Sequence, residues 1–237
     1  LDVKVGNGAF MKTLEEAREL GRLMVSIGEL CEEDVVALLS DMNQPLGVAV
    51  GNALETKEAI QTLKGEGPQD FLDHCLEIAS QMLILGKRAN SKEEAQKMAE
   101  DSISSGKGLE FLKKLVEAQS GDVRVIDHPD MLPEAPVKKL IEAKESGIVS
   151  LVHARTIGET AVALGAGRMK KGDPIDPAVG ISVMVKVGQK VEVGQPLFLV
   201  HARDENTIEA VQSDLEGSVR IVQEDVPPLP LFYGLID

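Results

Sequence analysis

The sequence predicts an α/β domain, with an incomplete mixed or parallel sheet and packing helices, followed by a smaller β-rich domain. Three observations predict this class. A strand, an amphipathic helix and a second strand follow one another in residues 1–39. Helical periodicity then continues to about residue 119, and after a proline-rich stretch the pattern changes to short strands. We therefore place two domains, at 1–135 and 136–237.

The first element is a short strand, Leu1–Val5, which ends at the turn Gly6–Gly8. Thr13 is followed three residues later by Glu16, the spacing of a capping box, and this predicts a helix that continues to about Gly28. Its apolar stripe comprises Leu14, Ala17, Leu20, Leu23, Met24 and Ile27. We expect this stripe to pack on a sheet.

Val35–Leu39 is a continuous apolar run of the kind that is buried on both faces of a parallel sheet. With the preceding strand and helix it predicts a βαβ unit. Four segments with apolar residues at helical spacing come next: Ala53–Leu63, Phe71–Leu85, Glu93–Ile103 and Leu109–Ala118. Glycine-containing breaks separate them, so we interpret them as packing helices.

The proline-rich stretch Asp127–Pro136 is interpreted as a linker or domain edge. Beyond it, Gly147–Val152 alternates as a strand, and Val183–Val187 leads into the phrase Gly188–Leu197, whose glycines predict tight turns between short strands. This phrase resembles the barrel-sandwich fold of biotinyl and lipoyl carrier domains.

A carrier function is disfavoured, because those domains attach their group to a lysine in a Met-Lys-Met or Asp-Lys setting, and this chain has none there. We interpret Lys186 and Lys190 as solvent-facing strand or turn residues, and Met184 as a core residue. A structural β domain is favoured.

Composition excludes several classes of protein. No segment approaches the ~18 consecutive apolar residues of a membrane span, and there is no signal-peptide pattern at the start. Cys31 and Cys75, the only cysteines, form neither a disulfide framework nor a zinc motif, which fits the reducing cytoplasm. A formal charge of -14, with 3% aromatic residues and no tryptophan, makes nucleic acid an unfavourable partner.

Several phrases in order resemble the pyrimidine-nucleoside (thymidine) phosphorylase family, over essentially the whole chain. They are Asp2–Met11 (DVKVGNGAFM), Ser40–Gly47 (SDMNQPLG), Gly51–Glu55, Lys64–Pro68 and Leu164–Arg168. The second phrase is far more specific than a lone glycine motif.

This resemblance implies phosphate-dependent cleavage of pyrimidine nucleosides to free base and pentose 1-phosphate, by a cytoplasmic homodimer. The family's catalytic groups, namely a glycine-rich phosphate loop, a histidine, an arginine and a serine with a lysine shortly after it, are expected upstream of Leu1. We therefore expect no catalytic residue within this chain, which we interpret as a fragment or split subunit that is inactive alone. The alternative is a non-enzymatic structural or ligand-binding module left by truncation.

The resemblance also implies site residues. The family binds a monovalent cation, usually potassium, through two backbone carbonyls and a glutamate that match Leu46, Ala49 and Glu58, and an apolar residue near the pyrimidine matches Phe10. Irregular backbone around Leu46, imposed by its proline and glycine neighbours, leaves carbonyls free for a hard cation. Without the resemblance, we would interpret Glu58 as a solvated helix residue and Phe10 as a core aromatic.

Other polar residues have simpler explanations. Asp2 and Lys4 belong to the first phrase, but a salt bridge explains them as well as a substrate contact does. Arg168 follows a glycine-rich segment, and either an anion contact or helix termination accounts for it. Four scattered histidines are expected to be surface or hydrogen-bonded residues: His74, His128, His153 and His201.

Overall fold

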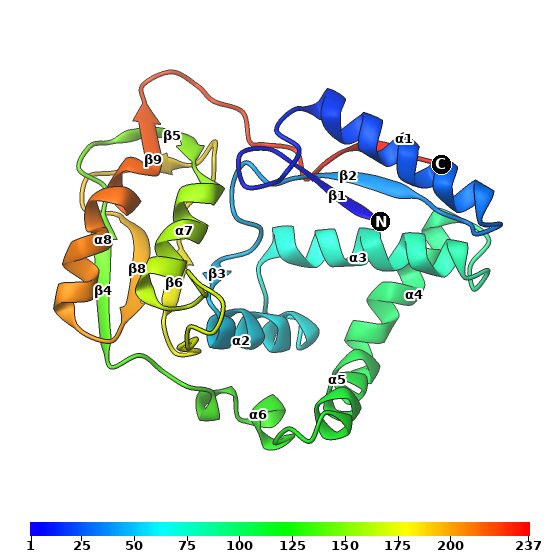
Figure 1. Ribbon diagram of the computed structural model, residues 1–237, viewed down its shortest axis with the longest axis horizontal. Helices are drawn as coiled ribbons and strands as arrows, with labels where there is room; N and C mark the ends of the chain where they lie inside the picture. The colour runs from blue at the N-terminus through cyan, green and yellow to red at the C-terminus, as the bar shows by residue number, and fades with distance from the viewer.

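The computed structural model describes residues 1–237 and shows two lobes linked by a helical segment (Figure 1). The sheet lobe comprises β1 (Asp2–Val5), α1 (Leu14–Leu30), β2 (Ala37–Asp41) and β10 (Phe232–Ile236). The helical segment comprises α2 (Asn52–Leu63), α3 (Gln69–Leu85), α4 (Lys92–Ser104), α5 (Lys107–Ala118), α6 (Arg124–Asp127) and the short 3-10 helix η1 (Pro129–Met131). The C-terminal lobe comprises β3 (Ala49–Val50), β4 (Val137–Glu142), β5 (Gly147–Val152), α7 (Ala154–Leu164), β6 (Gly180–Val183), β7 (Lys190–Val191), β8 (Pro196–Ala202), α8 (Glu205–Gly217) and β9 (Val219–Val222).

The sheet lobe has a three-stranded mixed sheet in the order β1-β2-β10. β1 pairs with β2 in parallel, as the predicted βαβ unit requires, and β10 pairs with β2 antiparallel. All five residues of the central strand β2 are buried. In Figure 1, α1 covers one face of this sheet and α3 runs along the other.

Helix α1 begins with the predicted capping box: the side chain of Thr13 accepts from the Glu16 amide, and the Glu16 side chain accepts from the Thr13 amide. The predicted stripe is only partly correct, because Leu23 and Ile27 are exposed. The buried residues are Ala17, Gly21, Val25 and Gly28. Small residues face the sheet because the helix lies very close to it: a methyl group on Gly21 would lie 2.8 Å from the Ile236 side chain of β10.

The four predicted packing helices are confirmed as α2 to α5, with ends within two residues of the expected ones. The breaks between them contain Gly65 and Gly106, whose φ angles of 81° and 76° lie in the left-handed region that favours glycine. No helix combines the length and the apolar character that crossing a bilayer demands.

The C-terminal lobe has two open sheets, in the orders β3-β6-β8-β4 and β7-β5-β9, with helices α7 and α8. The strands do not close into a barrel. Its core is the largest in the molecule and includes the fully buried side chains of Phe198, Ile157, Ile181, Leu164, Ile208 and Leu215. The predicted α/β class is correct at the level of a mixed α/β fold, and the last hundred residues contain two helices in addition to the expected strands.

Two strands cross between the lobes. β10, within residues 136–237, pairs with β2 of the sheet lobe. β3, within residues 1–135, pairs with β6 of the C-terminal lobe. The sheet of each lobe therefore includes one strand from the other part of the sequence. Both chain ends lie in the sheet lobe (Figure 1).

Candidate functional site

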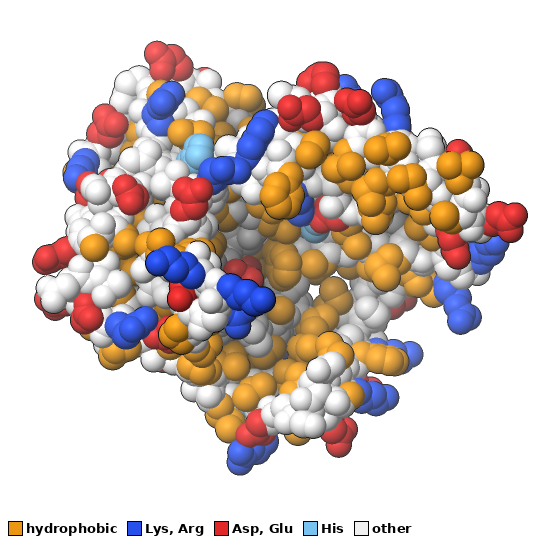
Figure 2. Space-filling model, in the orientation of Figure 1, with side chains coloured by type: hydrophobic (Ala, Val, Ile, Leu, Met, Phe, Trp, Pro, Cys, Tyr) orange, Lys and Arg blue, Asp and Glu red, His pale blue; other side chains and the backbone are white.

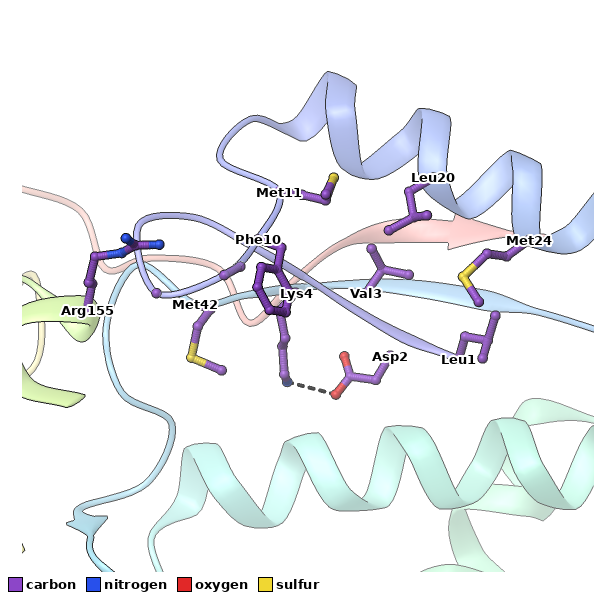
Figure 3. Close-up of a pocket in the computed structure, with 12 residues that line it drawn as sticks. Leu1, Asp2, Val3, Lys4, Phe10, Met11, Leu20, Met24, Met42 and Arg155 are labelled. Carbon is purple, nitrogen blue, oxygen red and sulfur yellow. Dashed lines mark ion pairs between the residues drawn. The ribbon is translucent and has the colours of Figure 1, made fainter. Parts of the chain in front are cut away.

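Phe10 lies at the rim of a pocket of about 440 Å³ between β1, α1 and the loop after β2 (Figure 3). Its exposed fraction is 95%, so it is not a core aromatic. The pocket is mainly apolar and is lined by Leu1, Asp2, Val3, Lys4, Gly8, Ala9, Phe10, Met11, Leu20, Met24, Met42 and Arg155. An exposed aromatic ring over an apolar pocket suits a flat, partly apolar ligand.

The turn before Phe10 is held in place by hydrogen bonds with two other segments of the chain. Gly6 has a φ of 127°, and the following Asn7 donates from its side chain to the carbonyl oxygen of Asn43 at 2.6 Å. Arg155, at the start of α7, donates to the Asn7 carbonyl oxygen at 3.2 Å. The C-terminal lobe therefore helps to fix the loop that presents Phe10.

A polar cluster lies on the side of β1 that faces α3 (Figure 3). Oδ2 of Asp2 lies 2.7 Å from Nζ of Lys4 and 2.9 Å from Nε2 of His74, and the hydroxyl group of Ser40 donates to Oδ1. Burial raises the pKa of Asp2, but the hydrogen bonds from His74, Lys4 and Ser40 outweigh it and hold this pKa well below its usual range. The salt-bridge interpretation of Asp2 and Lys4 is confirmed.

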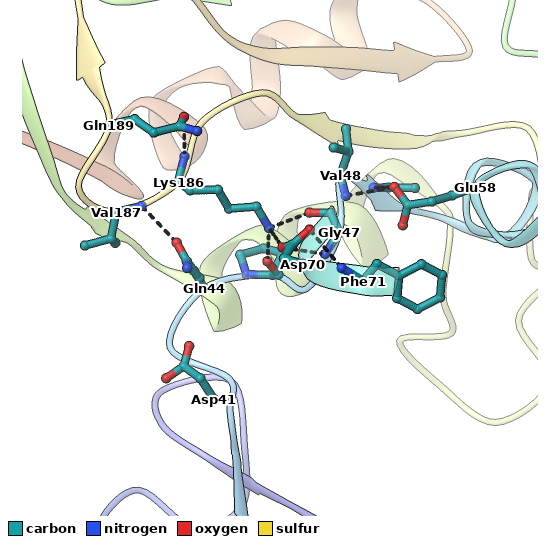
Figure 4. A network of polar contacts seen from close by, with 12 residues as sticks. Asp41, Gln44, Gly47, Val48, Glu58, Asp70, Phe71, Lys186, Val187 and Gln189 are labelled. Atoms are coloured by element: carbon teal, nitrogen blue, oxygen red, sulfur yellow. Dashed lines mark hydrogen bonds and ion pairs between the residues drawn. The ribbon is translucent and has the colours of Figure 1, made fainter. Parts of the chain in front are cut away.

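Glu58 lies on α2 and is buried, with an exposed fraction of 8%, so the solvated-helix interpretation is wrong. Its Oε1 accepts hydrogen bonds from the amides of Val48 at 2.8 Å and Ala49 at 3.0 Å (Figure 4). It forms no ion pair with a basic side chain of this chain. Burial raises its pKa above the ordinary value, in spite of these two amides.

Leu46, Ala49 and Glu58, the three predicted cation ligands, line one pocket of about 280 Å³. The carbonyl oxygen of Leu46 accepts no hydrogen bond within the chain. One carboxylate with backbone carbonyls is a donor set that suits a hard cation of low charge. The residues present therefore fit a monovalent cation.

Lys186 departs from its prediction. Its side chain has an exposed fraction of only 19%, and its Nζ lies 2.7 Å from Oδ2 of Asp70 while donating to the carbonyl oxygens of Pro45 and Gly47 (Figure 4). The solvent-facing interpretation is therefore wrong for Lys186, although it is correct for Lys190. Met184 is exposed by 48%, so its assignment to the core is also wrong.

The two pockets are adjacent, because Met42 lines both of them. Sequence reasoning did not identify Met42, Glu55 or Lys186 as part of this region. Glu55 precedes Glu58 by three residues on one face of α2, so helical spacing was a usable signal for it. No local signal exists for Lys186, which is separated by about 140 positions from the loop it contacts.

The remaining polar residues have structural roles. His153 caps α7 by accepting from the Thr156 amide, and His201 lies 3.2 Å from the hydroxyl group of Ser182. Gly165, in the left-handed conformation, ends α7, and Arg168 donates to a carbonyl of the next loop. No three histidine, cysteine or acidic side chains are grouped so that they could hold a metal ion.

Comparison with known proteins gives two family matches. Residues 1–109 match the family described as "Glycosyl transferase family, a/b domain", and residues 148–222 match the "Pyrimidine nucleoside phosphorylase C-terminal domain".

Individual relatives match along the whole chain. The pyrimidine-nucleoside phosphorylase of Bacillus subtilis strain 168 is 47% identical over 236 residues, which are 100% of this chain and 54% of that protein. The protein of the same name from Staphylococcus haemolyticus strain JCSC1435 is 46% identical over 228 residues, or 96% and 52%. That from Staphylococcus aureus strain MSSA476 is 46% identical over 237 residues, or 100% and 54%. The chain spans about half the length of the curated relatives it matches.

Proposed function

This chain belongs to the pyrimidine-nucleoside phosphorylase family, and from that premise we propose that it forms part of an enzyme that cleaves pyrimidine nucleosides with inorganic phosphate. The products are the free base and a pentose 1-phosphate. Within that enzyme, this chain contributes Phe10 beside the pyrimidine ring, and Leu46, Ala49 and Glu58 as ligands of a potassium ion.

The adjacency of the two pockets supports this assignment. Phe10 and the cation ligands lie more than thirty positions apart in the sequence, and the fold brings their pockets together on either side of Met42. The exposed ring of Phe10 offers an apolar face to a planar base. A substrate and an activating cation can therefore occupy neighbouring positions.

One observation carries the cation assignment: Glu58 is a buried carboxylate without an ion-pair partner. A buried charge is usually paired or coordinates a metal ion, because transfer out of water is costly. A bound potassium ion would supply that positive charge and hold the Leu46 loop on α2. The Ala49 and Val48 amides fix the carboxylate in position for this role.

On this proposal, the groups that hold phosphate and sugar correspond to the half of the relatives' length that lies outside the match to this chain.

The first test compares the intact protein with the 237-residue chain. Each is incubated with thymidine or uridine and phosphate, and release of thymine and uracil is measured by chromatography. We expect release by the intact protein and none by the chain alone. Turnover by the chain, with intact protein excluded, would contradict this division of groups. Absence of turnover by the intact protein would favour the non-enzymatic alternative.

A second test addresses the cation. Glu58→Gln keeps an oxygen acceptor for the Val48 and Ala49 amides but removes the charge, so the fold should persist and potassium activation should weaken. We expect the potassium concentration for half-maximal activity to rise by roughly tenfold, equivalent to about 1.4 kcal/mol. Glu209→Gln on the exposed face of α8 makes the same change in charge and should have no effect. Full potassium-dependent activity of Glu58→Gln would contradict the assignment.

The proposal has three further features, of which the first two come from the family resemblance and the third from the likeness of Gly188–Leu197 to carrier domains. The intact enzyme is a homodimer, and it acts in the cytoplasm on salvaged nucleosides. The C-terminal lobe is a variant of the barrel-sandwich fold with a structural role. Its turn residue Lys190 is exposed, yet it lacks the flanking residues of a carrier lysine.

A further inference from the structure

Lys186, in the loop between β6 and β7, has an ammonium group that is fully hydrogen bonded. Its Nζ donates to the carbonyl oxygens of Pro45 at 2.5 Å and Gly47 at 2.6 Å, and it lies 2.7 Å from Oδ2 of Asp70 (Figure 4). An ammonium group has three N–H donors, and these three oxygens account for all of them. The arrangement differs from that of an ordinary surface lysine, whose donors bind water.

These contacts fix the peptide plane that contains the Leu46 carbonyl. Oδ2 of Asp70 accepts from the Gly47 amide at 3.1 Å. That amide and the Leu46 carbonyl belong to one planar trans peptide, in which C=O and N–H point in opposite directions. The Leu46 carbonyl must therefore point away from Asp70, and it accepts no hydrogen bond within the chain.

The lysine is itself held by the C-terminal lobe. Its neighbours Val185 and Val187 are buried in the core of that lobe. The Val187 amide also donates to the side chain of Gln44 at 2.9 Å, so the two loops are joined at a second point. The position of the ammonium group therefore follows the position of the C-terminal lobe.

We propose that Lys186 is a positioning residue for the cation site: together with Asp70 it orients the Leu46 carbonyl, so that the C-terminal lobe contributes to cation affinity. This inference rests on the proposed cation site at Leu46, Ala49 and Glu58.

Removal of the Lys186 ammonium group has opposite expected effects on cation affinity, depending on whether its charge or its orienting role dominates. The direction of the change in affinity therefore tests the inference. The ammonium group is close enough to Glu58 to act on that carboxylate, and a positive charge there opposes the binding of a second cation. Removal of the ammonium should strengthen cation binding if charge dominates. It should weaken binding if orientation of the Leu46 carbonyl dominates, as we propose.

The experiment uses the intact protein and thallium(I), a monovalent cation of potassium size, whose binding is followed by thallium-205 NMR without any assay of activity. We expect Lys186→Met to weaken thallium binding by roughly tenfold. Lys190→Met, at the next exposed lysine of the same lobe, should leave binding unchanged. In Lys186→Ala, n-propylamine replaces the missing atoms and should restore binding, whereas propan-1-ol should not.

A second variant tests the same plane without altering the lysine. Asp70→Ala frees the Gly47 amide, whereas Asp70→Asn removes the same negative charge and keeps an oxygen acceptor for that amide, so Asp70→Ala should weaken thallium binding more than Asp70→Asn does. Unchanged or tighter binding by folded Lys186→Met, or equal binding by Asp70→Ala and Asp70→Asn if Lys186→Met does not fold, would overturn the inference. If Glu58→Gln alone weakens binding, the cation site stands and only the role of Lys186 fails. If the unaltered protein does not bind thallium, both fail.

Discussion

Tyr233 joins the last strand to the loop after β2 through a single hydroxyl group. It donates to Oδ1 of Asp41 at 2.7 Å, and the same carboxylate accepts from the backbone and side chain of Asn43. Asn43 in turn holds the turn that carries Phe10. A network of polar side chains thus links β10 to the candidate substrate pocket. The protonation state of its Tyr233 hydroxyl group is measurable.

Burial and the adjacent Asp41 carboxylate raise the pKa of Tyr233 to about 12. Because this folded-state pKa exceeds the unfolded value of about 10, the contribution of the Tyr233 hydroxyl to stability is complete below about pH 10 and is lost as the pH rises toward about 12. Tyr233 is the only tyrosine, and there is no tryptophan, so ultraviolet absorbance reports its ionisation directly. We expect a midpoint near 12 in the folded protein.

The matched control is Asp41→Asn, which removes the negative charge and keeps an acceptor for the hydroxyl group. Its tyrosine should titrate closer to the ordinary value, with folding at each pH checked by circular dichroism. A midpoint near 10 in the unaltered folded protein would show that Tyr233 is solvated.

At the scale of single elements, a helical glycine can lie where the helix packs tightly against a neighbouring segment, or where the helix faces open space. Gly28 of α1 lies against the Val35 side chain and the Glu33 carbonyl oxygen, whereas a methyl group on Gly158 of α7 would meet no atom within 4 Å. Both are helical residues, so both would gain helix propensity on replacement by alanine. Only the packing differs.

We therefore expect Gly28→Ala to lower the free energy of unfolding by about 1–2 kcal/mol, because overpacking costs ~1–3 kcal/mol and exceeds the gain in propensity. Gly158→Ala should raise it by up to about 1 kcal/mol. Urea denaturation followed by circular dichroism measures both. If Gly28→Ala stabilised the protein, α1 would have to lie too far from the 33–35 loop for a methyl group on residue 28 to clash with Val35.

At the scale of the whole molecule, the last strand makes the sheet lobe dependent on the C-terminal end. β2 is buried, with β1 on one side and β10 on the other, and the Asp41 amide donates to the Leu231 carbonyl oxygen. Phe232 of the same strand stacks on His74 of α3, with 5.3 Å between ring centroids. The β1-β2 sheet thus gains its third strand, β10, only after the chain has passed through the C-terminal lobe.

Deletion of residues 231–237 should therefore destabilise the sheet lobe while leaving the C-terminal lobe folded. Native-state hydrogen exchange would measure this effect, since it reports local opening separately for each lobe. We expect β2 amides that face β10 to exchange at least tenfold faster, and amides of β8 to keep their protection. Equal loss in both lobes would indicate a single cooperative unit, and unchanged protection of β2 would contradict the role of β10.

Much of the local structure was predictable because its signals lie within a few residues. The Thr13 and Glu16 capping box, the glycine breaks between the helices and the parallel β1–β2 pair all follow from short patterns. The candidate cation ligands were implied by the family resemblance of the phrase around Leu46, since Glu58 alone looks like an exposed helix residue. Its burial could not be read from α2, because the loop at residues 44–49 is what covers it.

The amino-acid sequence was enough to predict the family and the order of most elements, and the resemblance to that family implied the donor groups of the candidate cation site. These properties depend on residue identity and on spacing within short segments. The folded chain was needed to show which face of α1 is buried, that β10 completes the first sheet, and that Lys186 contacts the Leu46 loop. Each of these depends on segments far apart in the chain, where close packing and the need to satisfy buried polar groups select the partners.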